Sequence, residues 1–264
     1  MPPVFSVTSE QLSVWIVAFF WPFVRMLALI STAPLFSEHA VPRTAKVGLA
    51  ALLAIVIAPT LGALPSVPLV SAGGFWILIQ QVLVGAAMGF SMRLVFAIVQ
   101  AAGEYTGLQM GLSFASFFDP TSGGQTMVLA RLLNVMAMLI FLALDGHLTL
   151  IMTLAESFGV LPIADAPLTA GGWYLLASAG SQIFSGGLML ALPIVATLLT
   201  LNLAMGILNR VSPQFSIFSV GFPVTLLAGM GMLQILMHYL APFLAPRFAG
   251  GMEFILQFLQ GLRG

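Results

Sequence analysis

The chain has 264 residues, of which 60% are hydrophobic and only 6% are charged, against about 25% charged in an ordinary soluble protein. Eight basic and eight acidic residues give a net charge of zero, and they are too few to form the polar shell of a soluble domain. This composition excludes a single soluble domain and a disordered chain, and it predicts an all-α membrane protein. A membrane β-barrel is not expected, because the apolar runs are continuous rather than alternating.

Six hydrophobic segments are expected to form helices. They cover residues 12–33, 45–64, 75–100, 127–154, 166–209 and 211–246, and a short amphipathic helix is expected at 252–262. About 20 residues span a bilayer, so the 44 uncharged residues of 166–209 are too many for one straight span and should bend or break. Pro193 is the expected kink, and Gly171 and Gly172 mark an expected break before Trp173.

Several classes of function find no support in the residues. The chain has no cysteine, which excludes disulfides and thiolate metal sites. Its three histidines are widely separated, it has no basic patch, and it carries no phosphate loop or nucleophile motif. We therefore expect neither an enzyme nor a protein that binds metals, cofactors or nucleic acids.

Residues 103–126 form a glycine-rich, mixed stretch between two hydrophobic segments. Phe114, Phe117 and Phe118 precede Asp119-Pro120, a pair that initiates turns. One hypothesis is a re-entrant or pore-lining loop with an apolar plug, since irregular backbone at membrane depth needs protein or a water-filled cavity beside it. The other is a connecting loop with aromatic side chains at the interface, which composition alone favours.

Two other polar features interrupt the apolar runs. Asp145-Gly146-His147 reads as a helix end rather than as a proton relay. Arg25 should either pair with an acidic residue of another helix or extend its charged end toward the membrane surface. The segment 209–223 reads as the polar apex of a helical hairpin, which either docks a partner or only turns the chain.

An ordered set of short motifs covers roughly residues 10–245. They are Arg25–Ile30, Ala33–Phe36, Val41-Pro42, Lys46, Gly103-Glu104, Gly107–Ala115, Asp119-Pro120, Phe141-Leu142, Gly146–Leu148, Ser157-Phe158, Leu161-Pro162, Leu192-Pro193, Asn209-Arg210, Pro213-Gln214 and Gly221–Pro223. No single motif is specific, but in this order they resemble the family of the flagellar biosynthetic protein FliR.

The resemblance implies a subunit of the type III secretion export apparatus in the bacterial inner membrane, at the flagellar basal body. Its partners would be FliP-like and FliQ-like gate subunits and a FlhB-like switch protein, and its cargo unfolded flagellar proteins. The chain would be one integral-membrane domain over 1–264, with a FliP-like part at 1–160 and a FliQ-like hairpin part at 161–264. The alternative from another class, a secondary transporter, would usually show matching halves, and none is evident.

The same resemblance assigns two candidate sites. The predicted plug of the gate comprises Gly107, Gln109, Met110, Gly111, Phe114, Phe117, Phe118, Asp119 and Pro120. The predicted hairpin apex that contacts the switch protein comprises Asn209, Arg210, Pro213 and Gln214.

Overall fold

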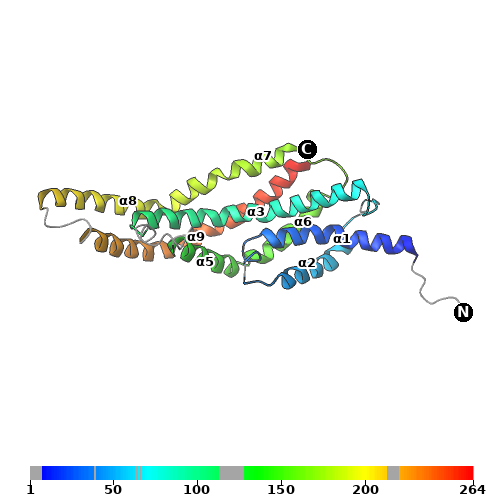
Figure 1. Cartoon of the computed structure of the whole chain (residues 1–264), viewed down its shortest axis with the longest axis horizontal. Helices are drawn as coiled ribbons and strands as arrows, with labels where there is room; N and C mark the ends of the chain where they lie inside the picture. The colour runs from blue at the N-terminus through cyan, green and yellow to red at the C-terminus, as the bar shows by residue number, and fades with distance from the viewer. Residues whose placement is uncertain are drawn as a thin grey trace. The chain divides into compact units, whose positions relative to one another are not determined.

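The computed structural model describes residues 8–38, 40–62, 65, 67–112, 128–212 and 220–263 (Figure 1). All regular structure in these residues is helical, which confirms the predicted all-α fold class. The elements are α1 (Ser9–Thr32), α2 (Arg43–Ile57), the 3-10 helix η1 (Ala58–Thr60), α3 (Ala72–Gln109), α5 (Val128–Ala143), α6 (Gly146–Val160), α7 (Ala170–Ala179), α8 (Ser181–Val211) and α9 (Phe222–Arg263).

The number of apolar segments agrees with the sequence prediction. Within the described part of the chain, five stretches of helix are long and apolar enough to cross a membrane, and α5 with α6 would make a sixth if the pair forms one broken span. The five are Trp15–Thr32, Arg43–Thr60, Ala72–Gln109, Ala170–Val211 and Phe222–Arg263. This count rests on length and composition.

Several predicted helix boundaries are wrong. The helix predicted at 75–100 continues to Gln109, and the separate end helix predicted at 252–262 is the last part of the continuous α9. Pro193 lies inside α8, where the expected kink stays a prediction, and the uncharged run breaks at Gly180, between α7 and α8. Gly171 and Gly172 do not break a helix, because they lie in the first turn of α7.

The position of Gly172 shows why it is glycine. A β-carbon there would lie 2.6 Å from the carbonyl oxygen of Phe258 and 2.7 Å from the side chain of Leu262. Trp173 packs edge-to-face on Phe258, with 5.5 Å between ring centroids. The glycine therefore allows α7 to approach α9 closely and does not end a helix.

The chain divides into two compact units, and both are discontinuous in sequence. The first comprises Met1–Arg93, His147–Ser178 and Gly250–Gly264, and the second comprises Leu94–Gly146 and Ala179–Ala249. The long helices α3 and α9 each contribute to both units. The predicted division near residue 160 into two family-like parts stays a prediction.

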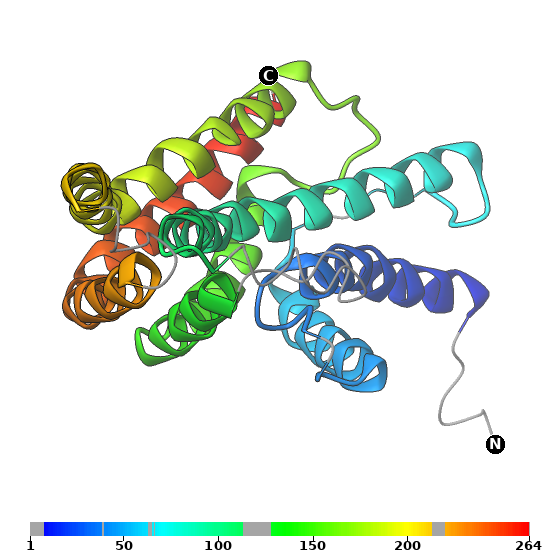
Figure 2. The same cartoon turned by 60° about the vertical axis from the view of Figure 1, so that its left-hand side comes forward.

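In the first unit, α1 and α2 lie side by side (Figure 2). Trp21 and Met26 of α1, Ile77 of α3, Leu150 of α6 and Phe258 of α9 are fully buried or nearly so. The long linker between α6 and α7 is fixed to the end of α9. Its Thr169 donates from the backbone to the Leu262 carbonyl at 2.9 Å and from its hydroxyl to the Gly261 carbonyl at 2.6 Å.

In the second unit, three phenylalanine rings from three helices form the centre of the core. The ring centroids of Phe96, Phe141 and Phe248 are 5.0–5.6 Å apart. Gly103 of α3 lies against the backbone of Ala130, so α3 and α5 approach closely there. Aromatic clusters bury large apolar areas, and small residues let helix backbones come together.

Candidate functional site

The part of the predicted plug that the structure describes is the C-terminal end of α3. The N–H of Gly111 donates to the carbonyl of Leu108 and the N–H of Leu112 donates to that of Gly107, both at 3.0 Å. Gly111 has a φ of 81°. These bonds and the left-handed residue are the Schellman motif, which ends many helices and favours glycine. Gly111 therefore ends a helix that continues well into the glycine-rich stretch predicted from residue 103.

This end of α3 is anchored on α9 within the second unit. Met110 is 2% exposed, and its Sδ and Cε lie 2.7 Å from where a β-carbon at position 229 would be. Gly229 thus leaves the space that Met110 fills. Phe114, Phe117, Phe118, Asp119 and Pro120 lie outside the described residues, so the plug stays a prediction.

The predicted hairpin apex is described only on its α8 side. Asn209 is half-buried and Arg210 is exposed, and both lie in the last turns of α8. A cation at a helix C-terminus interacts favourably with the helix dipole. Pro213 and Gln214 lie outside the described residues. The start of α8 contacts the middle of α9, where the Arg247 guanidinium reaches the sulfur of Met189 at 3.6 Å, so the two arms run antiparallel as a hairpin requires.

The Asp145-Gly146-His147 motif is a helix boundary, as the sequence predicted. The N–H of Leu144 donates to Ile140 and that of Asp145 to Leu142 at the end of α5, and Asp145 has a φ of 54°. Gly146 packs against the ring of Phe141 so closely that no β-carbon would fit. Aspartate tolerates this left-handed conformation better than most residues.

Arg25 follows neither of the two arrangements expected from the sequence. Its side chain is 0% exposed, so it does not reach the surface. Nε donates to Oε1 of Gln81 at 2.7 Å, Nη1 donates to the carbonyl and hydroxyl oxygens of Ser157 at 3.2 Å, and Nη2 donates to the carbonyl of Leu161 at 3.0 Å. No described acidic residue forms an ion pair with it.

Neutral oxygens and an aromatic ring therefore surround the Arg25 guanidinium. Its Cζ lies 4.3 Å from the centroid of the Phe158 ring. Hydrogen bonds from a charged donor are roughly twice as strong as neutral ones, and a cation over a ring adds further stabilisation. The buried guanidinium thereby joins α1, α3 and α6. The signal in the sequence was Gln80-Gln81, a polar pair in an otherwise apolar run.

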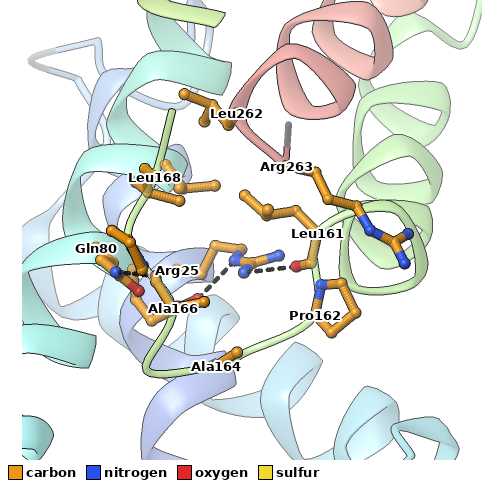
Figure 3. Close-up of a pocket in the computed structure, with 12 residues that line it drawn as sticks. Arg25, Gln80, Leu161, Pro162, Ala164, Ala166, Leu168, Leu262 and Arg263 are labelled. Atoms are coloured by element: carbon orange, nitrogen blue, oxygen red, sulfur yellow. Dashed lines mark hydrogen bonds between the residues drawn. The ribbon is translucent and has the colours of Figure 1, made fainter. Parts of the chain in front are cut away.

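A cavity of about 230 Å³ lies beside this arginine in the first unit (Figure 3). The α6–α7 linker, α3 and the end of α9 enclose it. Its lining residues include Arg25, Gln80, Gln81, Leu161, Leu168 and Arg263. Gln80 donates from Nε2 to the carbonyl of Ala166 at 2.7 Å, which holds the linker against α3.

Comparison with known proteins identifies the family. The model of the bacterial export proteins, family 1, matches residues 16–250. The flagellar biosynthetic protein FliR of Pectobacterium carotovorum subsp. carotovorum is 51% identical over 248 residues, which are 94% of this chain and 95% of that protein. The chain belongs to the FliR family of bacterial export proteins.

Other FliR proteins match over nearly the same range. FliR of Escherichia coli (strain K12) is 51% identical over 238 residues, covering 90% of this chain and 91% of that protein. FliR of Bacillus subtilis (strain 168) is 30% identical over 223 residues, covering 83% and 86%. The family assignment and the apolar helices together make this chain a membrane protein.

Proposed function

We propose that this chain is a subunit of the flagellar type III export gate and helps to form the channel through which unfolded flagellar proteins cross the inner membrane. The observation that carries the proposal is the match to an export family over residues 16–250, together with FliR relatives of high identity over most of the chain. The proposal involves no catalytic step and no cofactor.

The lengths of the helices support a place within an assembly. Helices α8, α3 and α9 have 31, 38 and 42 residues, or roughly 46, 57 and 63 Å at 1.5 Å per residue. A bilayer core is only about 30 Å thick. Long apolar helices that extend past the lipid need other protein around them, and FliP-like and FliQ-like subunits are the partners we propose.

The surface of α8 supports the same conclusion. Phe184, Met189, Leu203 and Ile207 are 60–69% exposed, and the sequence has no charge from Ser181 to Asn209. Lipid tails can cover such a face along the bilayer core only. The remaining length would be covered by the helices of neighbouring subunits, with Arg210 and Gln214 near the contact with the FlhB-like protein.

A plug between α3 and α5 completes the proposed gate. The Schellman motif fixes the point at which α3 ends, and α5 resumes at Val128. Three phenylalanines in the intervening segment would exclude water and ions, as hydrophobic constrictions do.

The function is tested by secretion. A strain that lacks this chain should be non-motile and should release no flagellar proteins to the medium, and the wild-type chain should restore both. The chain extracted in mild detergent should bring its partner subunits with it. Normal export without the chain would contradict the proposal, and so would a monodisperse chain without partners that takes up a small solute.

The plug is tested separately. Phe117→Ala or Phe118→Ala should leave the complex assembled and make the membrane permeable to small ions. A packing role would instead lower the yield of the complex without a leak. An intact complex with no leak in the alanine variants of Phe114, Phe117 and Phe118 would refute the plug.

A further inference from the structure

The cavity beside Arg25 carries an uncompensated positive charge. Two arginines, Arg25 and Arg263, are among its lining residues, and among the described residues no aspartate or glutamate lines it. The other polar lining side chains, Gln80 and Gln81, are neutral. A cavity lined by a buried guanidinium and a second arginine, with no acid, is complementary to an anion.

The geometry of Arg25 leaves it able to bind one. A guanidinium has five N–H donors, and the four hydrogen bonds of Arg25 to Gln81, Ser157 and Leu161 engage at most four of them. At least one N–H on Nη2 therefore has no acceptor among the described residues. Because the side chain is fully buried, little conformational entropy remains to be lost when an anion binds it.

Arg263 supplies the mobile half of the site. Its side chain is exposed, and its described contact is a long hydrogen bond of 3.4 Å from Nη1 to the carbonyl of Val160. Figure 3 shows Arg263 on the other side of the Leu161–Pro162 segment from Arg25. A side chain held by one long hydrogen bond can turn toward an anion in the cavity, and its planar guanidinium limits the entropy lost for each hydrogen bond that it then forms.

Size and lining select the class of anion. A volume of about 230 Å³ exceeds what a lone carboxylate needs and accommodates a phosphate group with part of its substituent. The walls contributed by Val84, Leu168 and Leu262 are apolar and suit the glycerol and first methylenes of a lipid. We propose that this cavity binds a phosphate group, from an anionic phospholipid or from free phosphate, at Arg25, with the Arg263 side chain turning toward it from the other side of the Leu161–Pro162 segment.

The experiment uses the full-length chain with its co-purifying partners in a non-ionic detergent. The midpoint of thermal unfolding is measured as dioleoylphosphatidylglycerol, dioleoylphosphatidylcholine or sodium phosphate is added, with sodium chloride at matched ionic strength as the baseline. Binding to the folded state should raise the midpoint in a saturable way. A rise with the anionic lipid alone identifies a lipid headgroup, and an equal rise with sodium phosphate identifies the free ion.

Two arginine variants decide whether the rise comes from this cavity. Arg263→Gln removes one cation from the cavity, and since the residue is exposed, the fold should persist. It should weaken binding about tenfold, the effect of losing roughly one charge-assisted hydrogen bond. Arg93→Gln is the matched control, because Arg93 is exposed on α3 and does not line the cavity.

Weaker binding in Arg263→Gln with unchanged binding in Arg93→Gln supports the site. Arg25→Gln is not used for this decision, because the buried Arg25 also holds three helices together. The proposal is overturned if no phosphate probe gives a saturable rise, if Arg263→Gln binds like the wild type, or if both variants lose binding equally. None of these outcomes depends on protein export, so the test is independent of the proposed function.

Discussion

Adding one methyl group at Gly103 should separate two helices of the second unit. The β-carbon of Gly103→Ala would lie 2.7 Å from the backbone nitrogen of Ala130 and 3.0 Å from the carbonyl carbon of Leu129. Ordinary contacts begin at 3.4 Å, so α3 and α5 must move apart by at least 0.7 Å, the difference between 3.4 Å and 2.7 Å. Because backbone atoms of two helices form the contact, no side-chain rotation relieves it.

The magnitude follows from two opposing terms. Overpacking of a core costs about 1–3 kcal/mol, whereas replacing glycine by alanine within a helix gains about 1 kcal/mol. Gly206→Ala is the matched control, since Gly206 lies in α8 of the same unit and a β-carbon there meets nothing within 4 Å. Both variants gain the helix term, so the difference between them isolates the contact with α5.

The assay is thermal unfolding of the full-length protein in detergent. Gly103→Ala should unfold below Gly206→Ala by an amount equivalent to about 1–3 kcal/mol, or roughly 2–4 °C for each kcal/mol in a chain of this size. Equal midpoints for the two variants would refute the close α3–α5 contact as a source of stability.

Three further substitutions test other parts of the structure. Leu201→Arg places a charge in the uncharged α8, at a cost of about 3 kcal/mol for insertion, and should prevent co-purification of partners; a motile strain with a normal complex would contradict this. Gly111→Ala forces a β-carbon into the left-handed conformation and should cost about 1 kcal/mol, whereas Gly231→Ala, in open space, should not; equal melting of the two would argue against the Schellman motif. Arg25→Met removes the donor to four buried acceptor atoms and should destabilise by about 3 kcal/mol, while Arg93→Met should change stability little; the prediction fails if both variants melt together.

Composition was sufficient to predict the fold class and the approximate number of apolar segments, because a chain with so few charges cannot form the polar surface of a soluble domain. It was insufficient for the helix ends. Gly172 was expected to mark a break and Gly103 opens the glycine-rich stretch 103–126, yet each lies within a helix where another backbone approaches it closely. Periodicity within one helix carries no information about a neighbour, so a glycine that permits contact and one that ends a helix, such as Gly111, look alike.

The site residues were predictable to a different extent. Arg25 was recognisable as an unusual charge in an apolar run, and Gln81 as part of a polar pair, but the other partners were not, since they are the hydroxyl and carbonyl of Ser157 and the carbonyl of Leu161. Backbone carbonyls have no signature in a sequence. The order of motifs indicated the FliR family, which comparison confirmed, although most residues of the predicted plug lie outside the described part of the chain.

Because the chain has few charges, only a few contacts can fix how its helices align with one another. In a membrane, apolar side chains contact lipid as favourably as they contact protein, so hydrophobicity alone does not fix how one helix lies against the next. In the first unit, alignment comes from the Arg25 hydrogen bonds and from Gly85 of α3, whose β-carbon would lie 2.9 Å from Cβ of Ala28. In the second, it comes from Gly103 and from Gly187, where a β-carbon would lie 2.8 Å from Cβ of Ala101. Exchange of one apolar side chain for another of similar volume should therefore be tolerated widely, while a single methyl group at these glycines should not. This arrangement leaves the outer apolar faces unconstrained by the fold, and it is those faces that we propose partner subunits cover.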